Sequence, residues 1–136
     1  MQEWTDFIKR VVISENRLQE RITELAQEIS EDYADKEILM VCILRGGVVF
    51  MADLLKRVTC PVNVEFMAVA SYGVGARESS GEVRITLDLN TSIKGRHVLI
   101  VEDIIDSGRT LASVIEMLET RDPASLFVCT LLDKYE

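Results

Sequence analysis

The apolar residues of this chain follow two spacings, one typical of helices and one typical of buried strands. After Ser14, a favourable capping residue, apolar side chains recur at steps of three and four from Leu18 to Tyr33, which predicts a helix with one buried stripe. Residues 38–44 are apolar without alternation, as in a strand that is covered on both faces. The same patterns predict a helix over 48–58, strands over 62–69, 83–89, 98–101 and 126–132, and a helix from Thr110 to the break at Asp122-Pro123.

This alternation of strands and helices predicts an α/β fold with a mostly parallel sheet and helices on both faces. Residues 83–89 alternate apolar and polar side chains and are expected in an antiparallel or edge strand. Residues 71–82 are rich in Gly and Ser and show no periodicity, so we expect a mobile loop there. At 136 residues, the chain is expected to form a single domain over residues 1–136.

Composition argues against several classes of protein. Hydrophobic residues make up 48% of the sequence and the longest apolar run is too short to span a bilayer, so we expect a cytoplasmic protein with no membrane partner. The 15 basic and 23 acidic residues give a net charge of −8, which argues against a nucleic-acid partner. Cys42 and Cys129 lie within apolar runs and are expected to be buried, reduced thiols.

The strongest chemical signal lies in residues 98–110. Two adjacent carboxylates, Glu102 and Asp103, close an apolar strand, and like charges so placed repel each other unless solvent, a metal ion or ligand hydroxyls receive them. Residues 106–110 then supply small side chains, hydroxyls and consecutive backbone N–H groups at a helix start, which favours anion binding. Ligands of open parallel sheets bind beyond the carboxyl ends of the strands, so the position also suits a binding site.

Each of these features alone has a simpler explanation, since acidic residues at strand ends are often only solvated and Ser-Gly before a helix is often only a cap. Together they are much more specific. The stretch VLIVEDIIDSGRT, from Val98 to Thr110, resembles the phosphoribosyl pyrophosphate motif of the purine phosphoribosyltransferases, and most of all that of their hypoxanthine-guanine members. The resemblance extends from Ser14 to Lys134 and implies the type I phosphoribosyltransferase fold.

The resemblance implies a role for each part of this motif. Glu102 and Asp103 would meet the ribose hydroxyls and the Mg²⁺ ion that they share, so both are expected metal ligands. Asp106 would be the catalytic residue, accepting the proton at purine N7. The implied substrate-binding residues are Glu102, Asp103, Ile104, Ile105, Asp106, Ser107, Gly108, Arg109 and Thr110, of which the last four would wrap the 5-phosphate.

Three further segments resemble binding elements of the family. Residues 44–47 look like its pyrophosphate loop, in which the family often has Lys at the position of Arg45, and the peptide bond before Arg45 is predicted to be cis. The segment beginning at residue 71 looks like a lid over the reacting centre, and Lys134 resembles the lysine that hydrogen-bonds the exocyclic oxygen at purine C6. Substrate contacts are thus implied for Arg45, Gly46, Gly47, Ser71, Tyr72 and Lys134.

The implied reaction is transfer of the phosphoribosyl group from phosphoribosyl pyrophosphate to N9 of a 6-oxopurine, hypoxanthine or guanine, with release of pyrophosphate. Xanthine stays open as a substrate, and a homodimer or homotetramer is expected. Family members continue beyond the strand that ends at Lys134 with an aromatic residue that stacks on the purine and another magnesium-binding aspartate. Because this sequence stops at Glu136, we expect a C-terminally truncated domain.

Two other functions share parts of this pattern. The letters VLIVED also resemble the first strand of a phosphoacceptor receiver domain, but only 33 residues follow Asp103, too few for the remaining units of that fold. The second is an RNA-binding regulator built on the transferase fold, like the pyrimidine attenuation proteins. The net charge of −8 weighs against it.

Overall fold

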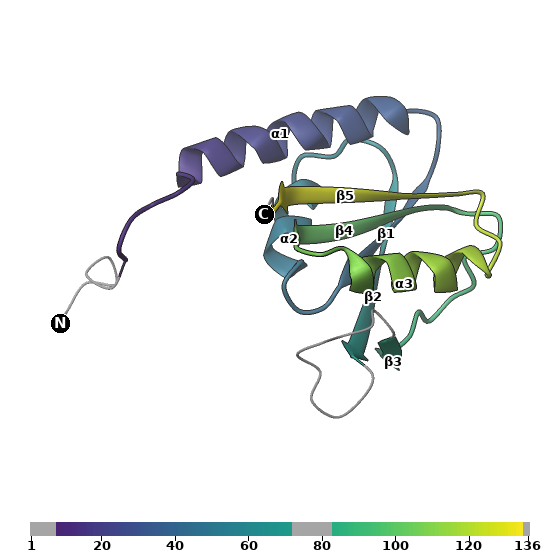
Figure 1. The fold of residues 1–136 in the computed structure, drawn as a ribbon. Helices are drawn as coiled ribbons and strands as arrows, with labels where there is room; N and C mark the ends of the chain where they lie inside the picture. Colours follow the sequence, from purple (N-terminus) through teal and green to yellow (C-terminus); the bar gives the residue numbers. More distant parts are fainter. Residues whose placement is uncertain (1–7, 72–82, 135–136) are drawn as a thin grey trace.

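The computed structural model describes residues 8–71 and 83–134 (Figure 1). Its elements are α1 (Glu15–Asp32), β1 (Ile38–Ile43), α2 (Val48–Leu55), β2 (Val62–Ser71), β3 (Val83–Leu87), β4 (His97–Ile105), α3 (Arg109–Glu119) and β5 (Ser125–Asp133). The strands form one sheet in the order β3-β2-β1-β4-β5, in which only β3 is antiparallel to its neighbour. The predicted α/β class, the mostly parallel sheet and the antiparallel edge position of residues 83–87 are confirmed.

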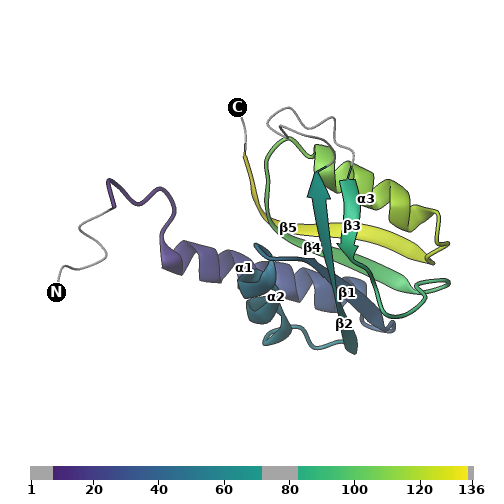
Figure 2. The same ribbon diagram turned by 90° about the horizontal axis from the view of Figure 1, so that it is seen from below.

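Helices cover both faces of the sheet, as predicted. Figure 2 shows α1 and α2 on one side of the strands and α3 on the other. One core lies between the sheet and the α1–α2 layer, and it includes Ile29, Met40, Leu54 and Val101. The other core lies under α3 and includes Val114. All six residues of β1 are buried, which explains why its sequence shows no polar alternation.

Helix α1 begins and packs as its sequence predicts. The Ser14 hydroxyl accepts a hydrogen bond from the Arg17 backbone N–H at 3.1 Å, which satisfies one donor of the first helical turn. The buried side of the helix consists of Ile22, Leu25, Ala26 and Ile29. Within the described residues, no helix is both long and apolar enough to cross a membrane.

The boundaries near the predicted site differ from those expected. Strand β4 runs four residues past Val101 to Ile105, because its ladder with β5 continues to the pair Ile105↔Asp133. Glu102 and Asp103 therefore lie inside the strand rather than at its end. Helix α3 begins at Arg109 rather than Thr110, after Gly108 adopts a left-handed conformation with φ 79°.

Candidate active site

The predicted site residues gather where the parallel strands β1, β4 and β5 end. Successive side chains of a strand point to opposite faces, and this alternation separates the two carboxylates of β4. Val101 belongs to the core on the α2 side and Ile100 to the core on the α3 side, so Asp103 continues the α2 side and Glu102 the α3 side. The two acidic residues therefore stand on either side of one strand.

On the α2 side, Asp103 lies against the segment predicted to bind pyrophosphate. The Leu44–Arg45 peptide bond is cis, as predicted. A Cβ atom added at Gly46 would stand 3.2 Å from Asp103 Oδ1, so the loop and this carboxylate touch because residue 46 has no side chain. Asp103 Oδ1 also accepts a hydrogen bond from the Ile104 backbone N–H at 2.9 Å. This carboxylate is thus held beside the loop.

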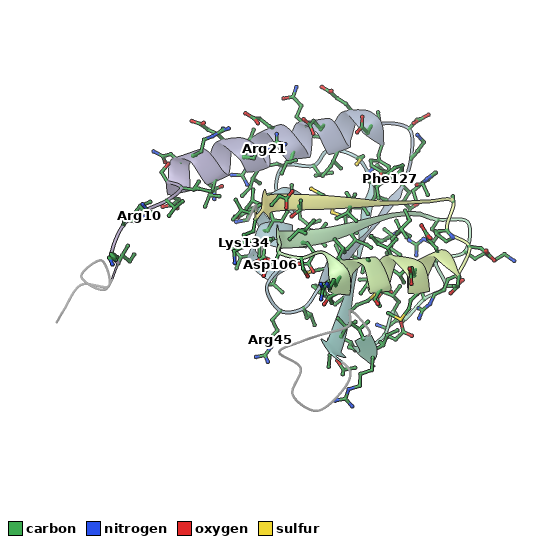
Figure 3. All side chains as sticks on the ribbon, viewed as in Figure 1. Arg10, Arg21, Arg45, Asp106, Phe127 and Lys134 are labelled. Atoms are coloured by element: carbon green, nitrogen blue, oxygen red, sulfur yellow. The ribbon has the colours of Figure 1, made fainter. Side chains whose placement is uncertain are left out.

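Gly47 brings the same loop close to the sheet. A Cβ atom there would lie 3.1 Å from the Val101 carbonyl oxygen and 3.2 Å from the Cys42 sulfur. Leu44 N–H donates to the Met67 carbonyl of β2 at 2.7 Å, which fixes the start of the loop. Arg45 is exposed and extends away from the body of the protein (Figure 3).

On the α3 side, Glu102 belongs to a hollow of about 190 Å³. Its lining consists of Glu102, Ile104, Ile105, Asp106, Ser107, Gly108, Thr110 and Leu111. The structure therefore brings together most of the predicted sugar-phosphate residues, whereas Asp103 and Arg109 are not part of this lining. The size suits a small anionic group rather than a whole nucleotide.

The loop between β4 and α3 has the backbone of an anion site. Gly108 precedes the helix with φ 79°, a conformation that costs glycine little, and as the N-cap residue it provides no side-chain hydrogen bond to the first turn. The Ser107 hydroxyl accepts a hydrogen bond from Arg109 N–H at 3.4 Å. Gly108 and Thr110 line the hollow, so the start of α3, with the positive end of its dipole, borders the hollow that Glu102 lines.

The pKa of Glu102 is shifted by burial and by the neighbouring charge of Asp103. Burial, followed by the negative charge of Asp103, raises the pKa of Glu102 from 4.5 to about 7. A cation near both carboxylates would relieve this repulsion. Within the described ranges, no group of three or more His, Cys, Asp or Glu side chains could hold a metal ion. Two carboxylates completed by substrate oxygens are nevertheless a donor set that suits Mg²⁺.

Asp106 and Lys134 face each other at the ends of β4 and β5 (Figure 3). Lys134 Nζ lies 3.9 Å from Asp106 Oδ1, and the Lys134 backbone N–H donates to the Ile105 carbonyl at 2.9 Å. This backbone hydrogen bond holds Lys134 next to Ile105, the residue before Asp106. The sequence predicted separate roles for Asp106 and Lys134, and the parallel pairing of β4 and β5 brings the two residues together.

Of the two residues predicted at the start of the lid, the structure describes only one. Ser71 is the last residue of β2, and Tyr72 with the rest of the expected lid lies outside the described residues. Cys42 was predicted only as a buried thiol and not as a neighbour of the site, yet a Cβ atom at Gly47 would lie 3.2 Å from its sulfur. Burial, followed by the charges of Glu102 and Asp103, raises the pKa of Cys42 to about 11, so its thiol stays neutral. Its place two residues before Leu44 on a buried strand was the available signal.

Comparison with known proteins agrees with this geometry. Residues 14–136 match the phosphoribosyl transferase domain family. The chain belongs to this family. It is 51% identical over 127 residues to the hypoxanthine phosphoribosyltransferase of Haemophilus influenzae, covering 91% of this chain and 70% of that relative. It is also 50% identical over 127 residues to the bifunctional protein TilS/HprT of Listeria monocytogenes serotype 4b, covering 93% of this chain but 19% of the longer protein.

Solved structures show the same phosphoribosyltransferase fold. A crystal structure of a hypoxanthine phosphoribosyltransferase from Staphylococcus aureus superposes with a TM-score of 0.90 at 42% identity, covering 96% of this chain and 70% of that chain. A hypoxanthine-guanine phosphoribosyltransferase from Bacillus anthracis gives a TM-score of 0.88 at 41% identity, covering 94% and 75%. The predicted type I phosphoribosyltransferase fold and the resemblance to the hypoxanthine-guanine members are confirmed.

Proposed function

We propose that this phosphoribosyltransferase transfers the phosphoribosyl group from phosphoribosyl pyrophosphate to N9 of hypoxanthine or guanine, producing IMP or GMP and pyrophosphate. The observation that best supports this proposal is that two loops suited to phosphate binding lie on either side of the end of strand β4. The loop at 44–47 touches Asp103 on one side of β4, and the loop at 106–110 shares a hollow with Glu102 on the other. A sugar with a phosphate at one end and a pyrophosphate at the other fits this arrangement.

Each loop then takes one end of the substrate. Residues 107–110 bind the 5-phosphate through backbone N–H groups at the start of α3, and residues 45–47 bind the pyrophosphate. This assignment explains how a chain with a net charge of −8 can bind a highly anionic substrate. Backbone N–H groups can bind phosphate oxygens without any basic side chain. The ribose lies across the end of β4, where Glu102 and Asp103 can accept hydrogen bonds from its hydroxyls.

Glu102 and Asp103 are also the residues that would hold Mg²⁺, together with oxygens of the substrate. A bound Mg²⁺ would neutralise charge on the departing pyrophosphate. The contribution of the chain itself is to place two carboxylates on either side of the strand end and to present backbone donors to the leaving group, since such fixed donors stabilise developing charge.

Asp106 and Lys134 serve the purine. Asp106 accepts the proton from N7 as the bond to N9 forms, which keeps the base from accumulating positive charge. Lys134 donates a hydrogen bond to the oxygen at C6. Their 3.9 Å separation allows both to reach the edge of the purine that carries N7 and the oxygen at C6.

A turnover assay tests this proposal. The protein is mixed with phosphoribosyl pyrophosphate, Mg²⁺ and each purine in turn, and nucleotide and pyrophosphate are measured together. We expect equal amounts of both products with hypoxanthine or guanine and much less with adenine, which lacks the oxygen at C6. RNA binding at physiological salt without any purine turnover would instead favour the RNA-binding regulator.

We further propose that this protein acts in the cytoplasm as a homodimer or homotetramer.

A further inference from the structure

The backbone conformation of Gly47 does not explain why this residue has no side chain. Its φ of −75° and ψ of −7° lie in the right-handed helical region, which any residue can adopt. The close approach of the sheet is the reason, since a Cβ atom would stand 3.1 Å from the Val101 carbonyl oxygen, 3.2 Å from the Cys42 sulfur and 3.4 Å from the Ile43 carbonyl oxygen. The end of the pyrophosphate loop, residues 44–47, therefore packs directly on β1 and β4.

Of the three atoms nearest to this position, only the Cys42 sulfur belongs to a side chain. The two carbonyl oxygens belong to the backbones of β1 and β4, which pair in parallel with Cys42 opposite Val101. The strand ladder sets the positions of these oxygens, whatever the residue type. The sulfur is therefore the contact among the three that a single substitution can remove, and Cys42 is fully buried, with 0% of its surface exposed.

We propose that Cys42 is a positioning residue for the pyrophosphate end of the substrate, a role that rests on the proposed function. Its sulfur contacts the loop at Gly47 and sets how closely the loop approaches the sheet. The backbone N–H groups of residues 45–47 are the proposed donors to pyrophosphate, and hydrogen bonds weaken steeply when donor and acceptor move out of line. A smaller side chain at position 42 would let these donors move away from the leaving group that they stabilise.

The other contacts of the loop hold its two ends along the chain. Leu44 N–H donates to the Met67 carbonyl at 2.7 Å, where the loop leaves β1. Met51 N–H donates to the Gly47 carbonyl at 2.9 Å, where the loop enters α2. Neither hydrogen bond supports the side of Gly47 that faces the sheet, whereas the Cys42 sulfur does. Removing the sulfur should therefore shift the loop without detaching it from β1 or from α2.

Cys129 provides the matched control for this role. It is a second buried thiol, 7% exposed, and it belongs to the same core as Cys42 between the sheet and the α1–α2 layer. It lies on β5, which the strand order separates from β1 by β4, and it is not among the atoms nearest to Gly47. Replacing either cysteine by Ala removes one buried sulfur from this core. Only the change at position 42 removes support from the loop.

The first test is a calorimetric titration with phosphoribosyl pyrophosphate and Mg²⁺. Cys42→Ala should weaken this binding about tenfold, because small misplacements of binding groups are costly. Cys42→Ser keeps an atom against Gly47 and should recover most of the affinity. Cys129→Ala should bind like the parent protein. Affinity for IMP, which has the 5-phosphate but no pyrophosphate, should be the same in the parent and in all three variants.

A second test examines the contact without any substrate. In Gly47→Ala the new methyl group meets the Cys42 sulfur, and the additional change Cys42→Ala removes that sulfur and leaves room for the methyl group. Urea unfolding should therefore show that Cys42→Ala costs less stability in the Gly47→Ala protein than in the parent. Strictly additive costs would mean that the sulfur does not limit the approach of the loop, and the proposal would be wrong.

Three binding results would overturn the positioning role: unchanged affinity for phosphoribosyl pyrophosphate in Cys42→Ala, an equal loss in Cys129→Ala, or an equal loss of affinity for IMP. If Cys42→Ala does not fold, Cys42→Val replaces it, since its wider side chain should push the loop outwards and lower the same affinity. If the parent binds neither ligand, the proposed function fails and the role of Cys42 in binding fails with it. The unfolding comparison then still decides whether the sulfur supports the loop.

Discussion

Lys134 Nζ lies 3.9 Å from Asp106 Oδ1, and both side chains are more than half exposed, at 52% and 69%. An ion pair with so much solvent around it contributes little to stability, typically less than about 1 kcal/mol. Its two members can therefore be exchanged for substrate contacts at small cost. The pair is better explained by what it presents to a ligand than by what it adds to the fold, and two predictions follow from this.

Replacing Asp106 by Asn should lower turnover by about 10²–10⁴-fold, because the amide cannot accept the N7 proton. The side chain keeps its shape, so the affinity for phosphoribosyl pyrophosphate should change little. Single-turnover measurements of nucleotide formation, with substrate binding followed by calorimetry, separate the two effects. An unchanged chemical step in the Asn variant would remove Asp106 from the role of base.

Replacing Lys134 by Met should raise the KM for hypoxanthine or guanine by about tenfold or more, since the oxygen at C6 loses its donor. Met keeps about the length of the lysine side chain and removes its charge. Selectivity against adenine should fall in the same variant, and this readout distinguishes loss of recognition from a general loss of folding. If the preference for 6-oxopurines survives intact, another residue recognises the C6 oxygen.

The sequence predicted the order and the direction of the elements well because their signals are local. The capping by Ser14 and the unbroken apolar run of β1 each depend on a few neighbouring residues, and both are present. The extent of β4 was underestimated because backbone pairing with β5 is a tertiary interaction, and it continues through Glu102 and Asp103 whatever their polarity. Glu102 and Asp103 therefore mark the predicted site, but they do not mark the residue at which β4 ends.

The pairwise geometry of the site could not be read from the sequence. Adjacent positions did not show on which side of β4 each carboxylate lies, and strand alternation places Glu102 in the hollow beside α3 and Asp103 against Gly46. Knowing that these residues lie within a strand would have predicted this separation. The contact of Cys42 with the loop depends on the close packing of β1 beneath Gly47, which no local pattern encodes.

The two glycines of the pyrophosphate loop should respond differently to alanine. At Gly47, a Cβ atom would stand 3.1 Å from the Val101 carbonyl oxygen, which is backbone and cannot move away, so Gly47→Ala should cost about 1–3 kcal/mol of unfolding free energy. At Gly46 the nearest atoms belong to the Asp103 side chain, at 3.2 and 3.3 Å, and that side chain can rotate. Gly46→Ala should therefore cost less than about 1 kcal/mol.

The substrate affinity of these variants completes the comparison. Gly46→Ala displaces a proposed magnesium ligand, so its affinity for phosphoribosyl pyrophosphate should fall even though its stability is nearly that of the parent. Urea unfolding gives the stabilities, and calorimetry with and without Mg²⁺ gives the affinities. Equal stabilities for the two variants would contradict the packing described around Gly47.

Glu102 makes a prediction about pH in the protein without metal. Burial and the charge of Asp103 raise the pKa of Glu102 from 4.5 to about 7, so the folded state holds this proton more tightly than the unfolded chain does. The stability from this group is fully present below about pH 4.5 and is lost as the pH rises through about 7, with a total of at most about 3 kcal/mol. Glu102→Gln cannot titrate and should lose less stability between about pH 5 and about pH 8. Glu116→Gln, on the exposed side of α3, is the matched control and should follow the parent protein. Urea unfolding in the presence of a chelator measures all three, and a pH dependence shared by the Glu102 and Glu116 variants would show that the repulsion between Glu102 and Asp103 is relieved in some other way.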